Sequence, residues 1–201
     1  MTSKVEICNV GLSTYLGLGP INSLTEGTPE AIQCDLHYDR LLKALLMKHW
    51  WTFAEGQQVL AVTANDRDEW AYKYARPADA MTIRWVNEAS AAKDLIALNQ
   101  SPDTPRKVVL NAIYSDTPSA SCCYTQMVDD PAFYPQTFAD ALSAHIAAAA
   151  AMAVTQNGRL AREAMQAAAY LTDVAMAHDA NEEPPEDYAQ TPGWLTARGV
   201  Q

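Results

Sequence analysis

One stretch decides the fold, because it contains a complete helix and the point at which that helix ends. Residues 28–54 read TPEAIQCDLHYDRLLKALLMKHWWTFA. Thr28 predicts an N-cap, and Pro29 at the first helical position has no N–H group to leave unpaired. Apolar residues then recur three or four positions apart, which predicts an amphipathic helix with one buried face. The residues on this face are Ala31, Cys34, Tyr38, Leu41 and Leu45, with Lys48 as a further candidate and with Leu42 and Leu46 beside them.

After His49 the sequence pattern changes from helix to strand. Aromatic and β-branched residues predict short antiparallel strands, and a turn at residues 116–118 joins the last two. Residues 87–104 are ambiguous, because 91–98 also fits one or two helical turns. The predicted strands lie within residues 51–62, 70–74, 81–86, 107–114 and 121–128.

The N-terminal segment predicts a second helix, from about Ser3 to Leu16. Ser3 is its N-cap, Glu6 completes a capping box, and Gly17 ends the helix. The first residues lack a basic region followed by an apolar one, so they do not predict a secretory signal. We therefore expect the chain to be made in the cytoplasm.

Helical periodicity returns towards the C-terminus, in two segments rich in alanine. They run from about residue 136 to 157 and from 159 to 178, and Gly158 permits a tight reversal between them. Small side chains let helix axes approach closely, so the pair predicts a compact antiparallel hairpin. The apolar part, 139–154, is short and carries a charged residue, so it fits a packed helix better than a membrane span.

These elements predict an α+β fold: a bundle of about four helices, two N-terminal and two C-terminal, with a central antiparallel β lobe. Residues 1–50 and 135–180 form the predicted bundle, and residues 51–134 form the inserted β-rich lobe. Residues 181–201 contain several prolines and an acidic run, which predict an extended C-terminal tail.

The overall composition restricts the classes of partner. The chain has 201 residues, 49% of them hydrophobic, which suits a compact folded protein. Its 14 Lys and Arg residues stand against 24 Asp and Glu residues, giving a formal net charge of -10. Neutralising nucleic-acid phosphates requires a basic face, so this composition argues against specific nucleic-acid binding.

The residues that usually hold metals or cofactors are scattered. The histidines, His37, His49, His145 and His178, form no H-E-x-x-H motif, and no cysteine pair has C-x-x-C spacing. Cys8 and Cys34 lie on apolar helix faces, where buried thiols are expected. Cys122 and Cys123 alternate along a predicted strand, so we expect at most one of them to be buried. We predict no metal and no cofactor.

No catalytic motif is present either. The chain has no G-x-S-x-G, no G-x-x-x-x-G-K-[ST] and no G-x-G-x-x-G. Glycoside hydrolysis needs only two carboxyl groups across a cleft, and Glu26 with Glu30 or Asp129 with Asp130 are the candidates. The first pair surrounds a helix N-terminus and the second precedes a proline turn, so both have structural explanations. We predict no catalytic residues.

The tryptophans are the less ordinary feature of the sequence. Adjacent Trp50 and Trp51 cannot both point into one core, so one of them faces either a neighbouring subunit or a lobe–bundle junction within the chain. Trp194 lies in the predicted tail, where an aromatic side chain can serve as an anchor that becomes ordered on docking.

The order of these motifs resembles that of a known family. Ile7-Cys8-Asn9 opens the first helix, and Trp50-Trp51-Thr52-Phe53-Ala54 follows the second. Trp70, Tyr72, Tyr74, Pro77 and Asp79 then follow as W-x-Y-x-Y-x-x-P-x-D. Over residues 4–180, and most closely over 4–80, the chain resembles the tail tubular protein A family of podoviruses and related prophage head–tail adaptors.

The resemblance implies a structural virion protein without a catalytic apparatus. Such a subunit forms a ring, usually of twelve copies, between the portal protein and the tail nozzle protein, and genomic DNA passes through without specific binding. We expect Trp50, Trp51, Phe53, Tyr188 and Trp194 to lie at subunit or portal interfaces. A ring of twelve copies at -10 each carries a charge of roughly -120, so we expect an acidic channel that repels DNA.

Two other functions remain compatible with the sequence. One is a tail-associated peptidoglycan hydrolase that uses the carboxylate pairs above. The other is a soluble α+β binding module that does not assemble. Binding to a portal separates the adaptor from both of them.

Overall fold

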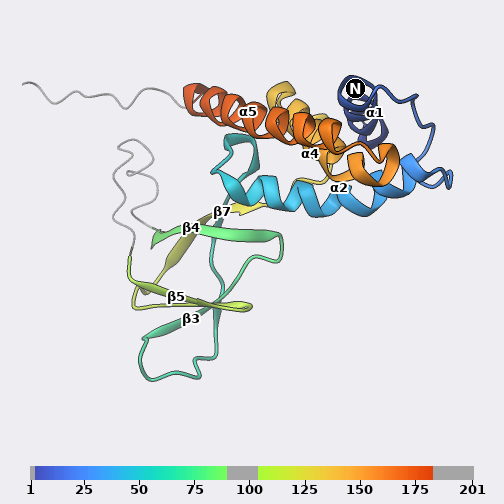
Figure 1. Ribbon diagram of the computed structural model, residues 1–201. Helices are drawn as coiled ribbons and strands as arrows, with labels where there is room; N and C mark the ends of the chain where they lie inside the picture. Colours follow the sequence, from blue (N-terminus) through green and yellow to red (C-terminus); the bar gives the residue numbers. More distant parts are fainter. Residues whose placement is uncertain (1–2, 90–103, 183–201) are drawn as a thin grey trace, which may run out of the picture.

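The computed structural model describes residues 3–89 and 104–182 and confirms the predicted α+β fold. Four helices lie at one end of the molecule, and two small antiparallel sheets project from them as a lobe (Figure 1). The predicted helical turns at 91–98 and the predicted tail, with Tyr188 and Trp194, lie outside the described residues.

The caps predicted from the sequence define both N-terminal helices. Helix α1 spans Lys4–Leu16, and its capping box is complete, because Ser3 and Glu6 bind each other's backbone N–H groups at 3.1 and 3.2 Å. Helix α2 spans Pro29–Lys48, and the Thr28 hydroxyl accepts the Ala31 N–H at 3.3 Å. The predicted stripe is confirmed as the buried face of α2 except at Lys48, which is exposed. The buried residues are Ala31, Cys34, Tyr38, Leu42, Leu45 and Leu46, and Leu41 is partly buried.

Helix α4, Gln136–Thr155, is the centre of the bundle, and α1, α2 and α5, Gly158–Glu182, all pack against it. Its small residues allow close packing: a Cβ atom added to Gly11 of α1 would collide with the carbonyl oxygen of Ser143. Within the described residues, α4 alone is long and apolar enough to cross a membrane, but 56% of that window is buried inside the protein. The burial fits the predicted core helix.

The lobe contains two sheets, and within each sheet all pairings are antiparallel. The three-stranded sheet has the order β1-β7-β4, formed by Glu55–Val59, Ala120–Gln126 and Ala80–Glu88. The four-stranded sheet has the order β2-β3-β6-β5, formed by Val62–Thr63, Tyr72–Ala75, Ala112–Ser115 and Arg106–Val109. Buried side chains from both sheets form one small core, which includes Leu60, Tyr74, Val86, Ile113 and Cys122.

The single strand predicted over residues 107–114 is wrong. The structure divides it into the hairpin strands β5 and β6, with Val109 paired to Ala112. Leu110 at the turn has a φ of 47°, a left-handed conformation that leucine rarely adopts. No Gly-containing turn signal marks this position in the sequence, so the run of apolar residues resembled one continuous strand.

The prediction that at most one of the vicinal cysteines is buried is also wrong, since both thiols are buried. β7 is the middle strand of its sheet, and both of its faces are covered. Cys122 faces the lobe core, whereas Cys123 lies near Glu55 and Arg84. Burial raises the pKa of Cys122 to about 11 and that of Cys123 to about 12, so both thiols stay protonated at neutral pH.

The strand predicted to leave α2 does not begin at Trp51. Residues Thr52–Ala54 form a short 3-10 helix, η1, and β1 begins only at Glu55. Trp51 and Ala54 belong to the core of the helices, as do Val128 and Tyr134 on the returning chain. A second 3-10 helix, η2, Pro131–Phe133, lies between β7 and α4. The helical core therefore extends beyond the predicted boundaries at residues 50 and 135.

Candidate interaction site at the junction of bundle and lobe

The two adjacent tryptophans lie in opposite environments. Trp51 is 1% exposed, and its indole N–H donates to the carbonyl oxygen of Leu45 at 2.8 Å. Its ring meets that of Phe138 edge to face, with centroids 5.0 Å apart. Trp50 is 58% exposed. His49, after the end of α2, has extended backbone angles, and successive side chains of an extended chain point to opposite sides.

The predicted interface residues therefore separate into three groups. Trp51 is a core residue of its own chain, which corrects the prediction that it contacts another subunit. Phe53 is partly buried and packs on Phe138 with a centroid separation of 4.8 Å, so it too belongs to the core. Trp50 presents its ring at the surface, whereas Tyr188 and Trp194 lie outside the described residues.

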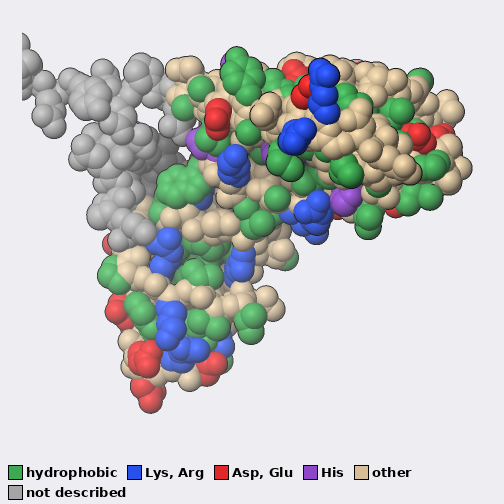
Figure 2. Space-filling model, in the orientation of Figure 1, with side chains coloured by type: hydrophobic (Ala, Val, Ile, Leu, Met, Phe, Trp, Pro, Cys, Tyr) green, Lys and Arg blue, Asp and Glu red, His purple; other side chains and the backbone are tan. Residues whose placement is uncertain are grey.

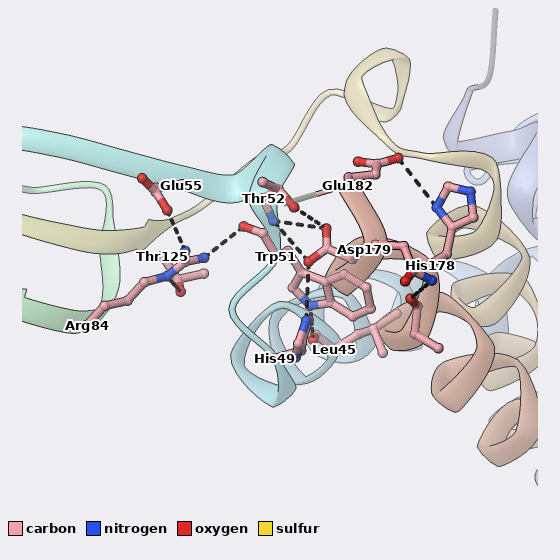
Figure 3. Close-up of polar contacts among 12 residues, drawn as sticks. Leu45, His49, Trp51, Thr52, Glu55, Arg84, Thr125, His178, Asp179 and Glu182 are labelled. Atoms are coloured by element: carbon pink, nitrogen blue, oxygen red, sulfur yellow. Dashed lines mark hydrogen bonds and ion pairs between the residues drawn. The ribbon is translucent and has the colours of Figure 1, made fainter. Parts of the chain in front are cut away.

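Asp179 connects the end of α5 to the segment that follows α2 (Figure 3). Its buried carboxylate accepts the Thr52 backbone N–H at 3.0 Å and the Thr52 hydroxyl at 2.7 Å. The Nε2 atom of His49 lies 3.2 Å from the same carboxylate. Three polar groups thus compensate for the burial of this charge.

Arg84 of β4 makes the matching connection from the lobe (Figure 3). Its guanidinium donates to the Trp51 carbonyl oxygen at 2.8 Å, to Glu55 at 2.9 Å and to the Thr125 hydroxyl at 3.2 Å. The guanidinium carbon lies 5.9 Å from the ring centroid of Trp50. Residues 50–52 are therefore held from the bundle by Asp179 and from the lobe by Arg84.

An open surface pocket of about 440 Å³ lies beside this network. It is lined by Lys48, His49, Trp50, Asp179 and Ala180, which come from the ends of α2 and α5. Trp50 contributes an exposed indole to this lining, and Lys48 and Asp179 contribute side chains of opposite charge. An exposed aromatic ring of this kind is typical of surfaces that contact other proteins.

Two further surfaces are suited to subunit contacts, on the faces of α2 and α5 that point away from α4. On α2, the exposed apolar side chains Ile32, Leu36 and Met47 share the outer face with Arg40 and Lys43. On α5, Tyr170 and Val174 are exposed close to the acidic side chain of Asp173. Lys43 and Asp173 make no ion pair with any residue in the described part of the chain.

The lobe carries a charged surface of its own. Figure 2 shows Lys and Arg side chains gathered on one face of the lobe, with Asp and Glu side chains near its tip. Two lysines of the lobe have acidic partners: Lys73 lies 3.0 Å from Asp66, and Lys107 lies 3.7 Å from Glu69. Over residues 51–89 and 104–134, nine acidic side chains outnumber six basic ones, so the described part of the lobe offers phosphate groups no net positive charge.

The four candidate carboxylates occupy structural positions. Glu26 closes the loop before α2, accepting N–H groups from Asn22 and Ser23 and the Thr28 hydroxyl. The Asn22 N–H is the main cause that lowers the pKa of Glu26, which is the opposite of what a general acid needs. Glu30 lies in the first turn of α2, Asp129 pairs with Lys4 at 2.8 Å, and Asp130 caps η2.

The histidines do not converge either. His145 Nε2 lies 2.9 Å from the hydroxyl oxygen of Thr172, which itself donates to the carbonyl of Ala168. Because the hydroxyl hydrogen of Thr172 is used by Ala168, the Nε2–H of His145 donates to Thr172. Burial, and then the charge of Lys48, lower the pKa of His145. Across residues 3–89 and 104–182, no three His, Cys, Asp or Glu side chains are grouped to hold a metal ion.

Sequence reasoning missed Asp179 and Arg84, although Asp179 leaves a signal. The buried face of α5 reads Ala164, Ala168, Thr172, Ala175 and Asp179, at three- and four-residue intervals. A polar residue in the register of an apolar stripe indicates a buried hydrogen-bonding partner elsewhere. Arg84 lies within a strand of alternating character and leaves no comparable signal.

The chain was also compared with known proteins. No protein-family model matches it, and no curated protein matches it either.

Proposed function

We propose that this chain is a structural subunit of a phage virion, a head-to-tail adaptor that forms a ring between the portal protein and the tail nozzle protein. The order of its sequence motifs supports this proposal, as does the combination of a helical bundle with a projecting β lobe. In this arrangement the ring lines the channel through which the genome leaves the head.

The observation that carries the proposal is the pair of outer helix faces. One face on α2 and a different face on α5 both expose large apolar side chains. A contact between two different surfaces of identical subunits is head-to-tail, and it closes into a ring when the rotation per subunit allows. The outer face of α2 in one copy would then meet the outer face of α5 in the next.

The charges on these faces fit such a contact. Arg40 and Lys43 accompany the apolar residues of α2, and Asp173 accompanies those of α5. Opposite charges across an interface favour the correct partner and fix its register, even where they add little affinity. The apolar side chains, Leu36 and Tyr170 foremost, are then expected to contribute most of the binding energy.

The net charge gives the ring its proposed effect on DNA. Each copy carries -10, so a ring concentrates negative charge around its channel. Repulsion from phosphate groups keeps the genome from adhering while it passes. Trp50, at the junction of bundle and lobe, is the proposed contact to a partner above or below the ring.

Sedimentation of the chain mixed with the portal protein of the same virion tests this proposal. We expect co-sedimentation with the portal, and we expect Leu36→Glu and Tyr170→Glu each to weaken it by placing a charge in an apolar contact. Leu110→Glu is the matched control, because Leu110 is 84% exposed on the lobe and belongs to neither face.

Charge reversal distinguishes a head-to-tail contact from a general loss of binding. Lys43→Glu and Asp173→Lys should each weaken ring formation, and the double variant should recover part of the loss. The proposal would be contradicted by a wild-type chain that remains monomeric in the presence of its portal. Normal assembly of the α2 variants and of the α5 variants would also contradict it.

A further inference from the structure

Two contacts fix how α1 lies against α2. The ammonium of Lys4, in the first turn of α1, lies 3.4 Å from the Asp39 carboxylate and 5.2 Å from the ring centroid of Tyr38. One turn further along α1 and one turn back along α2, the thiols of Cys8 and Cys34 hydrogen-bond each other. The two helices therefore run antiparallel here, with the two sulfur atoms facing each other.

Both thiols are enclosed in the core of the bundle. Cys8 and Cys34 are 0% exposed, and both belong to the buried cluster that joins α1, α2 and α4. The pKa of Cys8 is raised, mainly by the hydrogen bond with Cys34 and then by burial. Cys8 therefore stays protonated while the bundle is closed, so its thiol becomes reactive only when α1 moves away from the other helices.

The other two cysteines of the chain are not placed to bond with this pair. Cys122 and Cys123 lie next to each other on β7, where successive side chains point to opposite faces. Cys122 belongs to the separate core of the lobe, and Cys123 lies near Glu55. A disulfide requires two sulfur atoms that can approach each other, and the fold meets this requirement for Cys8 and Cys34.

We propose that Cys8 and Cys34 form a site of reversible oxidation, at which a disulfide bond joins α1 to α2. The oxidant is a low-molecular-weight disulfide of the glutathione type. One cysteine thiolate attacks this disulfide, forms a mixed disulfide and releases one glutathione. The second cysteine thiolate attacks the protein sulfur of the mixed disulfide and releases the other glutathione. The two cysteine sulfurs are oxidised, and the two glutathione sulfurs are reduced and take up the two protons.

The bond changes the stability of a single subunit. It closes a loop that contains residues 8–34, and a closed loop restricts the unfolded chain more than the folded one. The thiols are expected to stay reduced in a cytoplasm and to become oxidised where disulfides persist. The cross-link lies within one chain, so it does not depend on assembly into a ring.

A thiol–disulfide equilibrium in the folded and in the unfolded chain tests the proposal. The full-length chain is unfolded in urea, so that all thiols are accessible, and is then diluted into a buffer of reduced and oxidised glutathione. After an acid quench, endoproteinase Glu-C cuts after Glu26 and Glu30, which separates Cys8 from Cys34 unless a disulfide joins them. Mass spectrometry of the fragments gives the fraction of chains with a bond between Cys8 and Cys34.

The same equilibrium measured in concentrated urea provides the reference. We expect the equilibrium constant for the Cys8–Cys34 bond to be roughly tenfold higher or more in the folded chain, because the fold holds the two sulfur atoms together. By the same thermodynamic cycle, the oxidised chain should unfold at a higher urea concentration than the reduced chain, and a reductant should reverse this shift.

Two variants provide the controls, and circular dichroism verifies that each is folded. The double variant with Cys122→Ala and Cys123→Ala should keep the gain on folding. In Cys34→Ala, Cys8 can form only a mixed disulfide with glutathione, which does not fit the core, so folding should disfavour its oxidation.

Two results would overturn the proposal. One is an equilibrium constant for the Cys8–Cys34 bond that is no higher in the folded wild-type chain than in urea. The other is a folded chain in which the main cross-link uses Cys122 or Cys123.

Discussion

The carboxylate of Asp179 accepts both the backbone N–H and the hydroxyl of Thr52, a residue 127 positions earlier in the chain. This contact ties the last turns of α5 to the segment that carries the two tryptophans. Because Arg84 holds the carbonyl of Trp51 from the lobe side, the orientation of residues 50–52 depends on both parts of the molecule.

Removing the Asp179 carboxylate should destabilise the fold. Asp179→Ala leaves the N–H and hydroxyl of Thr52 without their acceptor, and we expect a loss of about 1–3 kcal/mol in the free energy of unfolding. Urea denaturation followed by circular dichroism measures the loss. Asp173→Ala is the control on the same helix, since Asp173 is exposed, and should change stability by less than about 0.5 kcal/mol.

The two adjacent tryptophans should respond differently to truncation. Trp51→Ala opens a cavity in the core and removes the indole hydrogen bond to Leu45. We therefore expect the free energy of unfolding to fall by about 3–5 kcal/mol. Trp50→Ala removes an exposed ring and its contact with Arg84, which should cost no more than about 1 kcal/mol. Equal losses in denaturant melts would contradict the assignment of Trp51 to the core.

The close contact of α1 with α4 gives a third prediction. Gly11→Ala adds a Cβ atom against the carbonyl oxygen of Ser143, which belongs to the backbone and cannot rotate away. The helices must move apart to accommodate this atom. We expect the free energy of unfolding to fall by about 1–3 kcal/mol and the melting temperature to fall with it. Gly19→Ala is the control, because a Cβ atom there has no neighbour within 4 Å, and a similar loss in both variants would refute the packing argument.

The pH dependence of stability should contain a contribution from His145. Its pKa is lowered in the folded protein, mainly by burial, so the unfolded chain binds the proton more readily. The stabilisation is fully present above the ordinary pKa of about 6.5 and is lost as pH falls from there towards the lower, folded-state value. His145→Gln should therefore lose less stability than the wild type between pH 7 and pH 5, as measured by urea denaturation at each pH. An equal loss of stability in the wild type and in His145→Gln would contradict this contribution of His145.

The features predicted correctly from the sequence are those with local causes. Ser3 with Glu6, and Thr28 with Pro29, determine helix starts through contacts within four residues, so short windows reveal them. The stripe on α2 likewise follows from its spacing alone. The α+β order could be deduced from these signals and from the change in period after His49.

The errors concern features that depend on distant parts of the chain. Leu110 adopts a left-handed conformation because the strands on either side pair with each other, against its own preference. Cys122 and Cys123 are both buried because β7 lies between β1 and β4 and is covered on both faces. Alternation in one strand shows which side chains share a face, but not what covers it.

The candidate site was predicted only in part, for the same reason. The Trp50-Trp51 pair indicated that one ring lies outside the core, yet the sequence could not show which one. That outcome follows from the extended backbone at His49 and from the hydrogen bond between Trp51 and Leu45. The supporting residues Asp179 and Arg84 lie 127 and 33 positions from the residues that they bind.

The central claim is assembly of this chain into a ring on a portal, and electron microscopy of the purified portal with and without the chain tests it most directly. We expect an added ring of density on the tail-facing end of the portal, with twelve copies of the chain in a head-to-tail arrangement. A portal that looks the same with and without an excess of the folded chain would contradict it.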